Sequence, residues 1–500
     1  GRRSINREIN SDRARHTASV PVWRRARLDL VGVLVVAAGA WWAVRSNAFA
    51  GVPGSVYFGR TVTLNVALLV LPLAVWITGG LMGARVVGAL LGRTQPQSTA
   101  AVGRPLPALY RLSIGRRPWS ISNGAFIVSL IVALATCLAA FTTSYDAAKL
   151  RDARYATGAD LRITPSPTAS RPYTAADAAT FQTAGVAAAT PVIYAASNVI
   201  LRSDRTSDPA NLAAVDPARY PSIAPLEGTR FTNGSPAAAF QTLRDDPTAI
   251  LLSEEMAAFL KAKVGDKIHV VLARATAAQV DIPLHITGLF ERLPGFPDGA
   301  DAVMTLGRHT AAVPTKNPDF FLATTTRSDN DGLRTAEASL RARAPAVKID
   351  SRATALASDQ SSLAALNIAG LVGLDSMFSL AMAVVTIVIF VFGLLLSRRR
   401  EYVTLRAQGL EPSLIRRLIL LEATTVAAVG ALTGVGVGVV MGAYFVKVLR
   451  PLFVLSPAYA VPVVSVAAVI GLVLLAAGIA ATAASRLVNR LEPTELLRDE

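Results

Sequence analysis

The sequence contains a single cysteine, Cys137, which falls inside an apolar run. A lone cysteine excludes any disulfide within the chain, whatever the redox state of its compartment. The four histidines, at positions 16, 269, 285 and 309, lack the spacing of a metal site. We therefore expect no metal, and we interpret His269 and His285 as ordinary side chains of β-strands.

No G-x-x-x-x-G-K-[ST] run occurs anywhere in the sequence. Because that glycine-rich loop holds the nucleotide phosphates in P-loop ATPases, we expect no ATP hydrolysis, catalytic residue or bound cofactor in this chain. The run G-V-G-V-G at 434–438 lacks a preceding strand and lies in an apolar helix, which argues against a nucleotide site. Ionisable residues are also nearly absent from the interiors of the apolar runs, with Asp375, near the outer end of its run, as the exception.

Charge is sparse and unevenly placed. Charged residues make up 17% of the chain and hydrophobic residues 52%, a composition typical of a membrane protein with a large aqueous part. The net charge is +16, yet residues 144–370 carry 23 basic and 23 acidic residues. The positive excess lies in short segments beside apolar runs, which indicates membrane topology rather than a nucleic-acid partner.

Six stretches have roughly the 20 apolar residues that a transmembrane helix needs. They are 28–44, 62–82, 121–141, 370–396, 418–443 and 461–484. Basic flanks place 1–27, 93–118, 398–417 and 486–500 on the cytoplasmic side, so that 45–61, 144–370 and 447–460 lie outside. The predicted fold class is an α-helical polytopic membrane protein with six transmembrane helices and an α+β extracytoplasmic domain on a helical stalk.

The predicted units follow from these boundaries. They are a basic segment 1–27, two connector transmembrane helices in 28–92, a cytoplasmic linker with an interfacial amphipathic helix in 93–118, transmembrane helices at 119–143, 371–397, 418–446 and 461–485, an outer domain at 144–370, a cytoplasmic segment at 398–417 and a tail at 486–500. The amphipathic pattern occupies 105–118, where an unstructured linker is the alternative.

The outer domain alternates strand and helix patterns. Strands are predicted at 160–164, 192–201, 267–273, 282–290 and 320–325, where β-branched residues gather. Helices are predicted at 175–183, at 253–262 with Ser253 as N-cap, and at 332–343. Residues 144–155 and 354–370 continue as helix from their spans, and we expect them to form the stalk.

The segment 397–422, S-RRR-E-YVTLRAQG-LEPSLIRR-LILLE, lies between two apolar runs. Helix-favouring residues at 401–408, the stop at Gly409 and the start at Glu411-Pro412 predict two short cytoplasmic helices joining two spans. Such a device can pass a displacement between a soluble partner and the membrane. An ordinary basic connector is the alternative.

Four glycines of the next span repeat every fourth residue, at Gly430, Gly434, Gly438 and Gly442. This spacing predicts a ridge on which another helix packs closely. The partner helix could belong to this chain or to another.

The cytoplasmic segment closely resembles that of FtsX-like permeases, the MacB/FtsX/LolC class of ABC transporter membrane subunits. Their R-R-x-E-[FYI]-x-x-L-R-A-x-G motif appears here from Arg398 to Gly409, with Glu422 downstream. The resemblance implies that an ATPase couples to Arg399, Arg400, Glu401, Tyr402, Leu405, Arg406, Gly409, Arg416 and Arg417. Phrases of the outer domain and the tail L-E-P-T-E-L-L-R at 491–498 extend the likeness over 106–500.

The resemblance also implies partners and a mechanism. A separate ABC ATPase dimer would bind ATP and Mg²⁺ and drive the outer domain by mechanotransmission, in a bacterial plasma membrane. The outcome would be export or extraction of a lipid, lipoprotein, peptide or drug, or activation of an envelope protein. A second FtsX-like unit is required, either upstream in the same polypeptide or as a second copy. The first two spans, opening with R-x-R-L-D-L at 25–30, resemble the connector of long permeases, so the chain is expected to be the C-terminal half of such a protein.

Two other functions were weighed against this interpretation. A transmembrane sensor would need to recruit a cytoplasmic effector, because no cytoplasmic segment here is long enough to be one. A membrane-anchored hydrolase is disfavoured, because the sequence shows neither a catalytic triad nor metal-ligand spacing.

Overall fold

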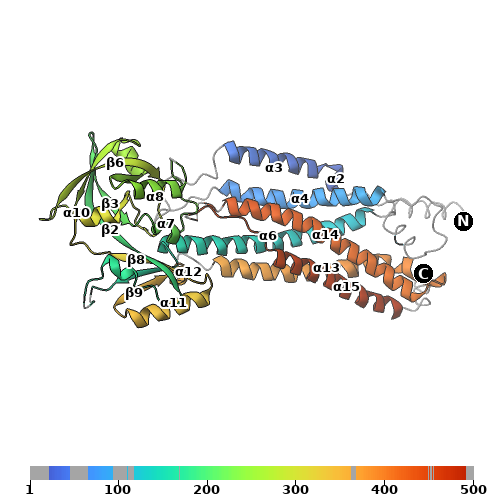
Figure 1. Ribbon diagram of the computed structural model, residues 1–500. Helices are drawn as coiled ribbons and strands as arrows, with labels where there is room; N and C mark the ends of the chain where they lie inside the picture. The colour runs from blue at the N-terminus through green and yellow to red at the C-terminus, as the bar shows by residue number, and fades with distance from the viewer. Residues whose placement is uncertain are drawn as a thin grey trace, which may run out of the picture.

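The computed structural model describes residues 22–45, 66–93, 110, 118–167, 169, 171–232, 234–361, 368–448, 450, 453 and 455–490. A bundle of long helices carries an α+β domain at one end (Figure 1). The predicted amphipathic helix at 105–118 lies outside the described residues except at its residues 110 and 118, and the tail at 491–500 lies wholly outside them.

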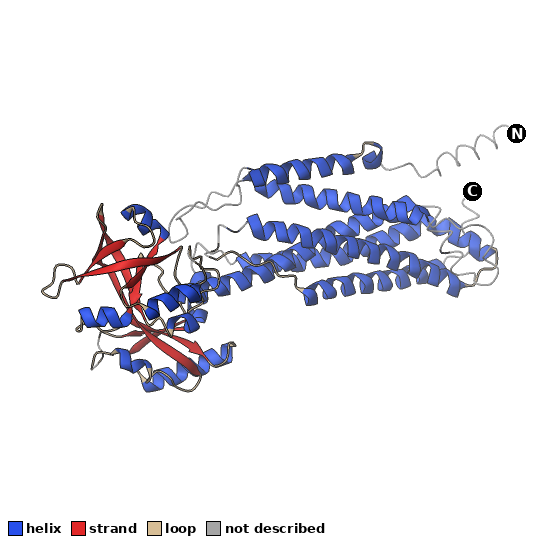
Figure 2. Cartoon of the chain, turned by 45° about the horizontal axis from the view of Figure 1, so that its top comes forward, coloured by secondary structure: helices blue, strands red, loops and turns tan. Residues whose placement is uncertain are grey.

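The bundle consists of long apolar helices that run side by side (Figure 2). They are α3 (Leu28–Arg45), α4 (Val66–Arg93), α6 (Pro118–Thr157), α13 (Ile368–Ala407), α14 (Pro412–Val448) and α15 (Val463–Arg490), preceded by the short α2 (Val22–Arg25). Five of them are long and apolar enough to cross a membrane. In the described part of α13 the apolar stretch extends only from Met377 to Gly393, so the sixth predicted span is not established.

Helix α6 lies at the centre of the bundle, where α4, α13, α14 and α15 all contact it. Its small residues allow this crowding: Ala125, Ala133 and Ala140 are each at most 2% exposed. Because α6 continues to Thr157 without a break, it leaves the bundle and enters the outer domain as a stalk, as the sequence predicts. At about 1.5 Å per residue its 40 residues span about 60 Å.

The outer domain is built on a nine-stranded mixed sheet in the order β3-β7-β4-β6-β5-β2-β8-β1-β9. The strands are β1 (Leu161–Pro165), β2 (Val186–Arg202), β3 (Ser207–Val215), β4 (Ala249–Ser253), β5 (Lys267–Leu272), β6 (Val280–Phe290), β7 (Ala302–Thr305), β8 (Phe320–Thr325) and β9 (Val347–Ser351). The long strand β2 pairs with β8 near its start and with β3 and β5 toward its end. It therefore joins the two halves of the domain.

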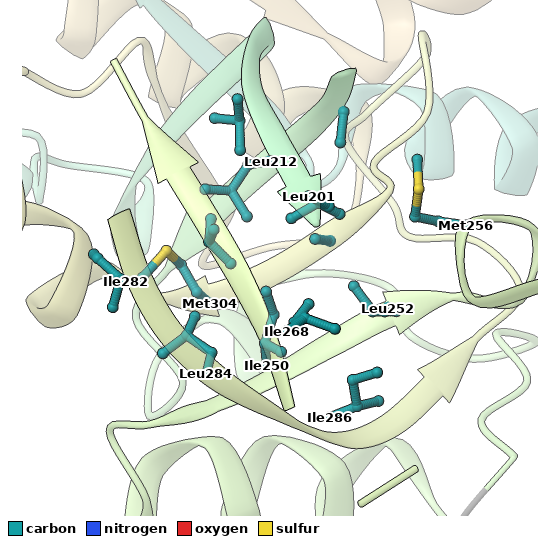
Figure 3. Close-up of a cluster of buried hydrophobic side chains, with 14 of the residues drawn as sticks. Leu201, Leu212, Ile250, Leu252, Met256, Ile268, Ile282, Leu284, Ile286 and Met304 are labelled. Carbon is teal, nitrogen blue, oxygen red and sulfur yellow. The ribbon is translucent and has the colours of Figure 1, made fainter. Parts of the chain in front are cut away.

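Each half has its own apolar core. One half contains the first and last strands of the domain, β1 and β9. In this half Leu161, Phe181 and Phe321 pack against α11 (Asn330–Arg343). In the other half, strands β2 to β7 enclose a cluster of aliphatic side chains with Met256 of α9 (Glu254–Leu260) at its edge (Figure 3). Three further helices cover this half: α7 (Tyr220–Ile223), α8 (Pro236–Asp245) and α10 (Leu306–Ala312).

One prediction for this domain is wrong, several strands were missed, and one predicted helix falls partly outside the described residues. Residues 175–183 form only a 3₁₀ turn, η1 (Ala175–Ala178), because the chain turns back through Gly185 at φ +88° to begin β2. Strands β3, β4, β7 and β9 were not predicted. Of the helix predicted at 354–370, the structure describes α12 (Arg352–Ser361) and the first residues of α13, and residues 362–367 lie outside the described residues.

Candidate coupling path

The second helix of the cytoplasmic segment begins at Pro412 and runs into the next span, as predicted, whereas the first predicted short helix is the end of the long α13. Helix α13 continues to Ala407, and Gly409 follows at φ +89°, a left-handed conformation that glycine adopts without strain. The backbone N–H of Leu410 donates to the carbonyl of Leu405 over 3.1 Å, which closes the helix end. Helix α14 then begins at Pro412, so one tight turn joins two long rods.

The predicted motif residue Tyr402 points into the bundle. Its side chain is 3% exposed and packs in the cluster that contains Ile415, Leu418 and Ile419 of α14. The Tyr402 hydroxyl donates a hydrogen bond of 3.3 Å to Oε2 of Glu422. This residue therefore fixes the end of α13 against α14.

The remaining predicted coupling residues divide by exposure. Arg416 and Arg417 are exposed on the first turns of α14, and Leu405 and Arg406 are half-buried. The side chains of Arg399, Arg400 and Glu401 lie outside those that the structure describes. The surface of this turn region is therefore basic, with Arg416 and Arg417 exposed, while Tyr402 is buried in the bundle.

Glu422 lies downstream of the sequence motif but is not among the predicted coupling residues. It is 1% exposed, near the cytoplasmic end of α14. One turn further along, Thr425 shares a hydrogen bond between hydroxyl groups with Tyr110, which precedes α6. A carboxyl group buried at this depth marks a functional position by default, and its place within the apolar run 418–443 is the signal that could have identified it.

The glycine ridge of α14 faces α6 of the same chain. A Cβ atom added at Gly434 would lie 2.7 Å from the carbonyl oxygen of Ser129, and one at Gly438 would lie 2.5 Å from that of Ala133. Gly430 and Gly442 also face α6. Because the two backbones nearly touch, α6 and α14 form a rigid pair.

The connector hairpin covers another side of this pair. Trp76 of α4 donates to the carbonyl of Leu130 over 2.7 Å, and the Ser122 hydroxyl donates to the carbonyl of Ala84. Helix α3 is attached to α4 through an ion pair between Asp29, which is fully buried, and Arg85. These two residues are 56 positions apart, so their pairing could not be read from the sequence.

The outer end of α6 meets a buried ion pair. Arg352, the first residue of α12, donates from Nη1 to Oδ1 of Asp160 over 2.9 Å, and both side chains are less than 10% exposed. The other carboxylate oxygen accepts hydrogen bonds from the backbone N–H and the hydroxyl of Thr325 at the end of β8. Asp160 therefore joins both ends of the outer domain, where the chain enters from α6 and leaves through α12.

Two glycines complete this junction. Gly158 (φ +89°) packs on Gly295, because a Cβ atom at Gly158 would lie 2.5 Å from the Cα of Gly295. The N–H of Gly295 donates to the carbonyl of Tyr155 over 2.8 Å. The last turn of the stalk is thus held by the loop around Gly295, and a displacement of α6 reaches the domain without a flexible linker.

The structure offers little for chemistry on a bound molecule. Among the described residues, no group of three or more His, Cys, Asp or Glu side chains is placed to hold a metal ion. A small hollow of about 50 Å³ lies between α8 and β6, lined by Phe231, Thr242 and Gly288 among others. It has room for little more than water.

Two family models match the chain. The model of the FtsX-like permease C-terminal domain matches residues 376–493, and that of the MacB-like periplasmic core domain matches residues 124–366. The first therefore covers α13 to α15, and the second covers α6 and the outer domain.

Two solved structures are similar in part. The extracellular domain of the noncanonic ABC-type transporter YknZ from Gram-positive bacteria is 12% identical with a TM-score of 0.29, over 38% of this chain and 98% of that chain. A domain of a putative permease protein from Porphyromonas gingivalis is 15% identical with a TM-score of 0.25, over 39% of this chain and 88% of that chain. Neither TM-score is high enough to bear on fold or function. No curated protein matches the chain.

Proposed function

Because the chain belongs to the FtsX/MacB-like permease family of ABC transporters, we propose that it couples ATP hydrolysis in a separate ATPase to movement of its outer domain. The observation that carries this proposal is the unbroken helix α6, which is packed on α14 inside the bundle and locked to the outer domain beyond it. A displacement of the bundle is thereby delivered to the domain.

The contact with the ATPase is assigned to the turn between α13 and α14. Its surface carries Arg416 and Arg417, and its underside rests on Tyr402 and Glu422. A rigid turn with a charged surface suits a partner that pushes on it. We assign ATP and Mg²⁺ to that partner, and no cofactor to this chain.

The remaining elements of the proposal follow from the family. The chain crosses the bacterial plasma membrane six times, with α13 counted among the six helices, and places residues 144–370 outside. It works with a second FtsX-like unit. Its output is export or extraction of a lipid, lipoprotein, peptide or drug, or activation of an envelope protein.

The test is co-purification of the chain, in mild detergent, with the ABC ATPases of its host, identified by mass spectrometry. Wild type is compared with Glu401→Arg in the turn segment and with Asp204→Arg, which reverses an exposed charge between β2 and β3. Wild type and Asp204→Arg should retain an ATPase that Glu401→Arg loses, with all three proteins eluting alike from gel filtration. If no ATPase accompanies wild type, or if Glu401→Arg retains it fully, the coupling assignment is wrong.

A further inference from the structure

The loop between α14 and α15 lies against the stalk. Residues 453 and 455–460 of this loop, which we call the strap, have no regular secondary structure. Phe453 is 5% exposed, and its ring meets that of Tyr145 edge-on at a centroid distance of 5.5 Å. The strap is therefore packed on α6 instead of projecting into solvent.

Two buried side chains of α6 bind the backbone of the strap. The N–H of Leu455 donates to Oδ1 of Asp152 over 3.0 Å, and the N–H of Ala460 donates to the hydroxyl oxygen of Ser144 over 3.0 Å. Ser144 is 1% exposed and Asp152 is 9% exposed. Since 144, 148 and 152 are spaced by four residues, they share one face of the helix, and the strap follows that face.

Further contacts extend the strap in both directions. The guanidinium of Arg151 donates to the carbonyl of Ser456 over 3.3 Å. The hydroxyl of Tyr459 donates to the carbonyl of Val439 in α14 over 2.8 Å. At the far end, Leu455 lies against Gly228 of the outer domain, where an added Cβ atom would be 3.4 Å from Leu455 Cδ2. The strap thus touches the bundle, the stalk and the outer domain.

We propose that the strap is a permanent tie that keeps the stalk part of α6 fixed to α14 and α15 while the transporter cycles. This inference rests on the proposed coupling function, and it makes Ser144 and Asp152 positioning residues of that mechanism. A single helix delivers a displacement only if it does not bend away from its support. A strap that stays docked supplies that support beyond the end of the glycine ridge.

The consequence concerns which parts move. With α6, α14 and α15 tied together on the outer side, and with α12 joined to the end of α6 through Arg352 and Asp160, relative movement is confined to α13. Helix α13 is suited to this role because Leu374, Met377 and Phe378 at its outer end are more than 60% exposed. These three side chains form one face of that end, and this face is exposed among the described residues.

Paired cysteines in the full chain test the tie, in membranes and with Cys137 replaced by Ala. The strap pair is Ser144→Cys with Ala460→Cys. The bundle pair is Gly124→Cys with Phe390→Cys, since a Cβ atom at Gly124 would meet the ring of Phe390 and so joins α6 to α13. Each pair is treated with a short bifunctional thiosulfonate, without nucleotide and with ATP plus vanadate.

A tie that stays docked shows no population shift, so the strap pair should cross-link to near completion with yields that differ by less than about twofold between conditions. A low yield without nucleotide, or a large fall with ATP and vanadate, would overturn the tie. If the cross-linking yield of the bundle pair also stays unchanged, the proposed ATP-driven movement is wrong, although the strap remains docked. The experiment thus tests the docked strap and the proposed ATP-driven movement separately.

A second variant examines the anchoring side chain. Asp152→Ala removes the acceptor of Leu455 and should slow cross-linking of the strap pair severalfold. Asp146→Ala removes the same side chain from an exposed position of the same helix and should not. Equal rates in the two variants would show that Asp152 does not position the strap.

Discussion

The hydroxyl of Tyr402 donates to the carboxylate of Glu422, and this bond links the cytoplasmic end of α13 to the inner part of α14. Both side chains are at most 3% exposed. A hydrogen bond between buried groups is costly to break, because the polar group left without its partner has no water to replace it. The pair therefore holds the end of α13 against α14, next to the turn on which the ATPase is proposed to act.

Removing the Tyr402 hydroxyl should lower the stability of the contact between α13 and α14 without leaving a large cavity in the apolar core. Tyr402→Phe keeps the ring but withdraws one donor from Glu422, at a cost of about 1–3 kcal/mol in the free energy of unfolding. We expect a lower Tm in detergent and a weaker stimulation of the partner ATPase. Tyr173→Phe, in the outer domain, is the matched control. Equal Tm and coupling in the two variants would assign Tyr402 to packing alone.

The glycine ridge makes a sharper steric prediction. At Gly438 a new Cβ atom would lie 2.5 Å from the carbonyl oxygen of Ala133 and 2.7 Å from Cβ of Thr136, so Gly438→Val must push α14 away from α6. Overpacking of this kind costs about 1–3 kcal/mol. At Gly436 nothing lies within 4 Å of the added atom, and Gly436→Val should behave as wild type. Thermal unfolding followed by near-UV circular dichroism measures the difference, which must be absent if the ridge faces lipid.

How far the sequence anticipated this structure depends on the range of each signal. Strand β8 was predicted at Phe320–Thr325, where it occurs, and Ser253 caps α9 as expected, because both are encoded by neighbouring residues. Strand β4 at Ala249–Ser253 was missed because it is short and fully buried, so that it lacks the alternation that marks a half-exposed strand.

The candidate site shows the same division. The motif located Tyr402, and the fourfold spacing located the ridge, yet neither showed what these residues contact. Asp160 and Arg352 pair across 192 positions, and Leu455 reaches Asp152 across 303. Such pairings depend on the course of the chain through the outer domain and the bundle, which no local pattern records.

The junction pair should be among the most sensitive positions of the outer domain. Asp160 receives Arg352, Thr324 and Thr325, so Asp160→Ala leaves a buried guanidinium without its counter-charge. Breaking a buried ion pair by removing one partner costs about 3–5 kcal/mol. The exposed pair of Arg334 and Asp331, 4.0 Å apart, is the control, and Arg334→Ala should leave the Tm unchanged.

A double-mutant cycle distinguishes pairing from local packing at this junction. If Asp160 and Arg352 act as a pair, combining Asp160→Ala with Arg352→Ala costs less than the sum of the single changes. Additive losses would mean that Asp160 works mainly through the β8 hydroxyl and backbone groups. The measurement is the Tm of the full chain in detergent, with the ATPase activity of the complex as a second readout.

His309 gives the outer domain a dependence on pH. This residue of α10 is 3% exposed, and burial, assisted by the charge of Lys316, lowers the pKa of its imidazole from 6.5 to about 4. Between pH 6.5 and about pH 4, the imidazole of His309 therefore binds a proton in the unfolded chain but not in the folded chain. The stabilising contribution is complete above pH 6.5 and is lost as the pH falls toward 4. At about 1.4 kcal/mol per pKa unit, the loss amounts to about 3 kcal/mol.

Replacing His309 by Gln should remove this contribution to the pH dependence. Thermal unfolding of the detergent-solubilised chain at pH 7.5 and pH 4.5 should show a smaller difference in Tm for His309→Gln than for wild type. His269→Gln changes the same residue type at an exposed position of β5 and should retain the wild-type difference. Acid-titrating carboxylates lower the Tm of all three proteins alike, so only the gap between variants reports on His309. Parallel Tm profiles for wild type and His309→Gln would show that the buried imidazole is protonated without cost.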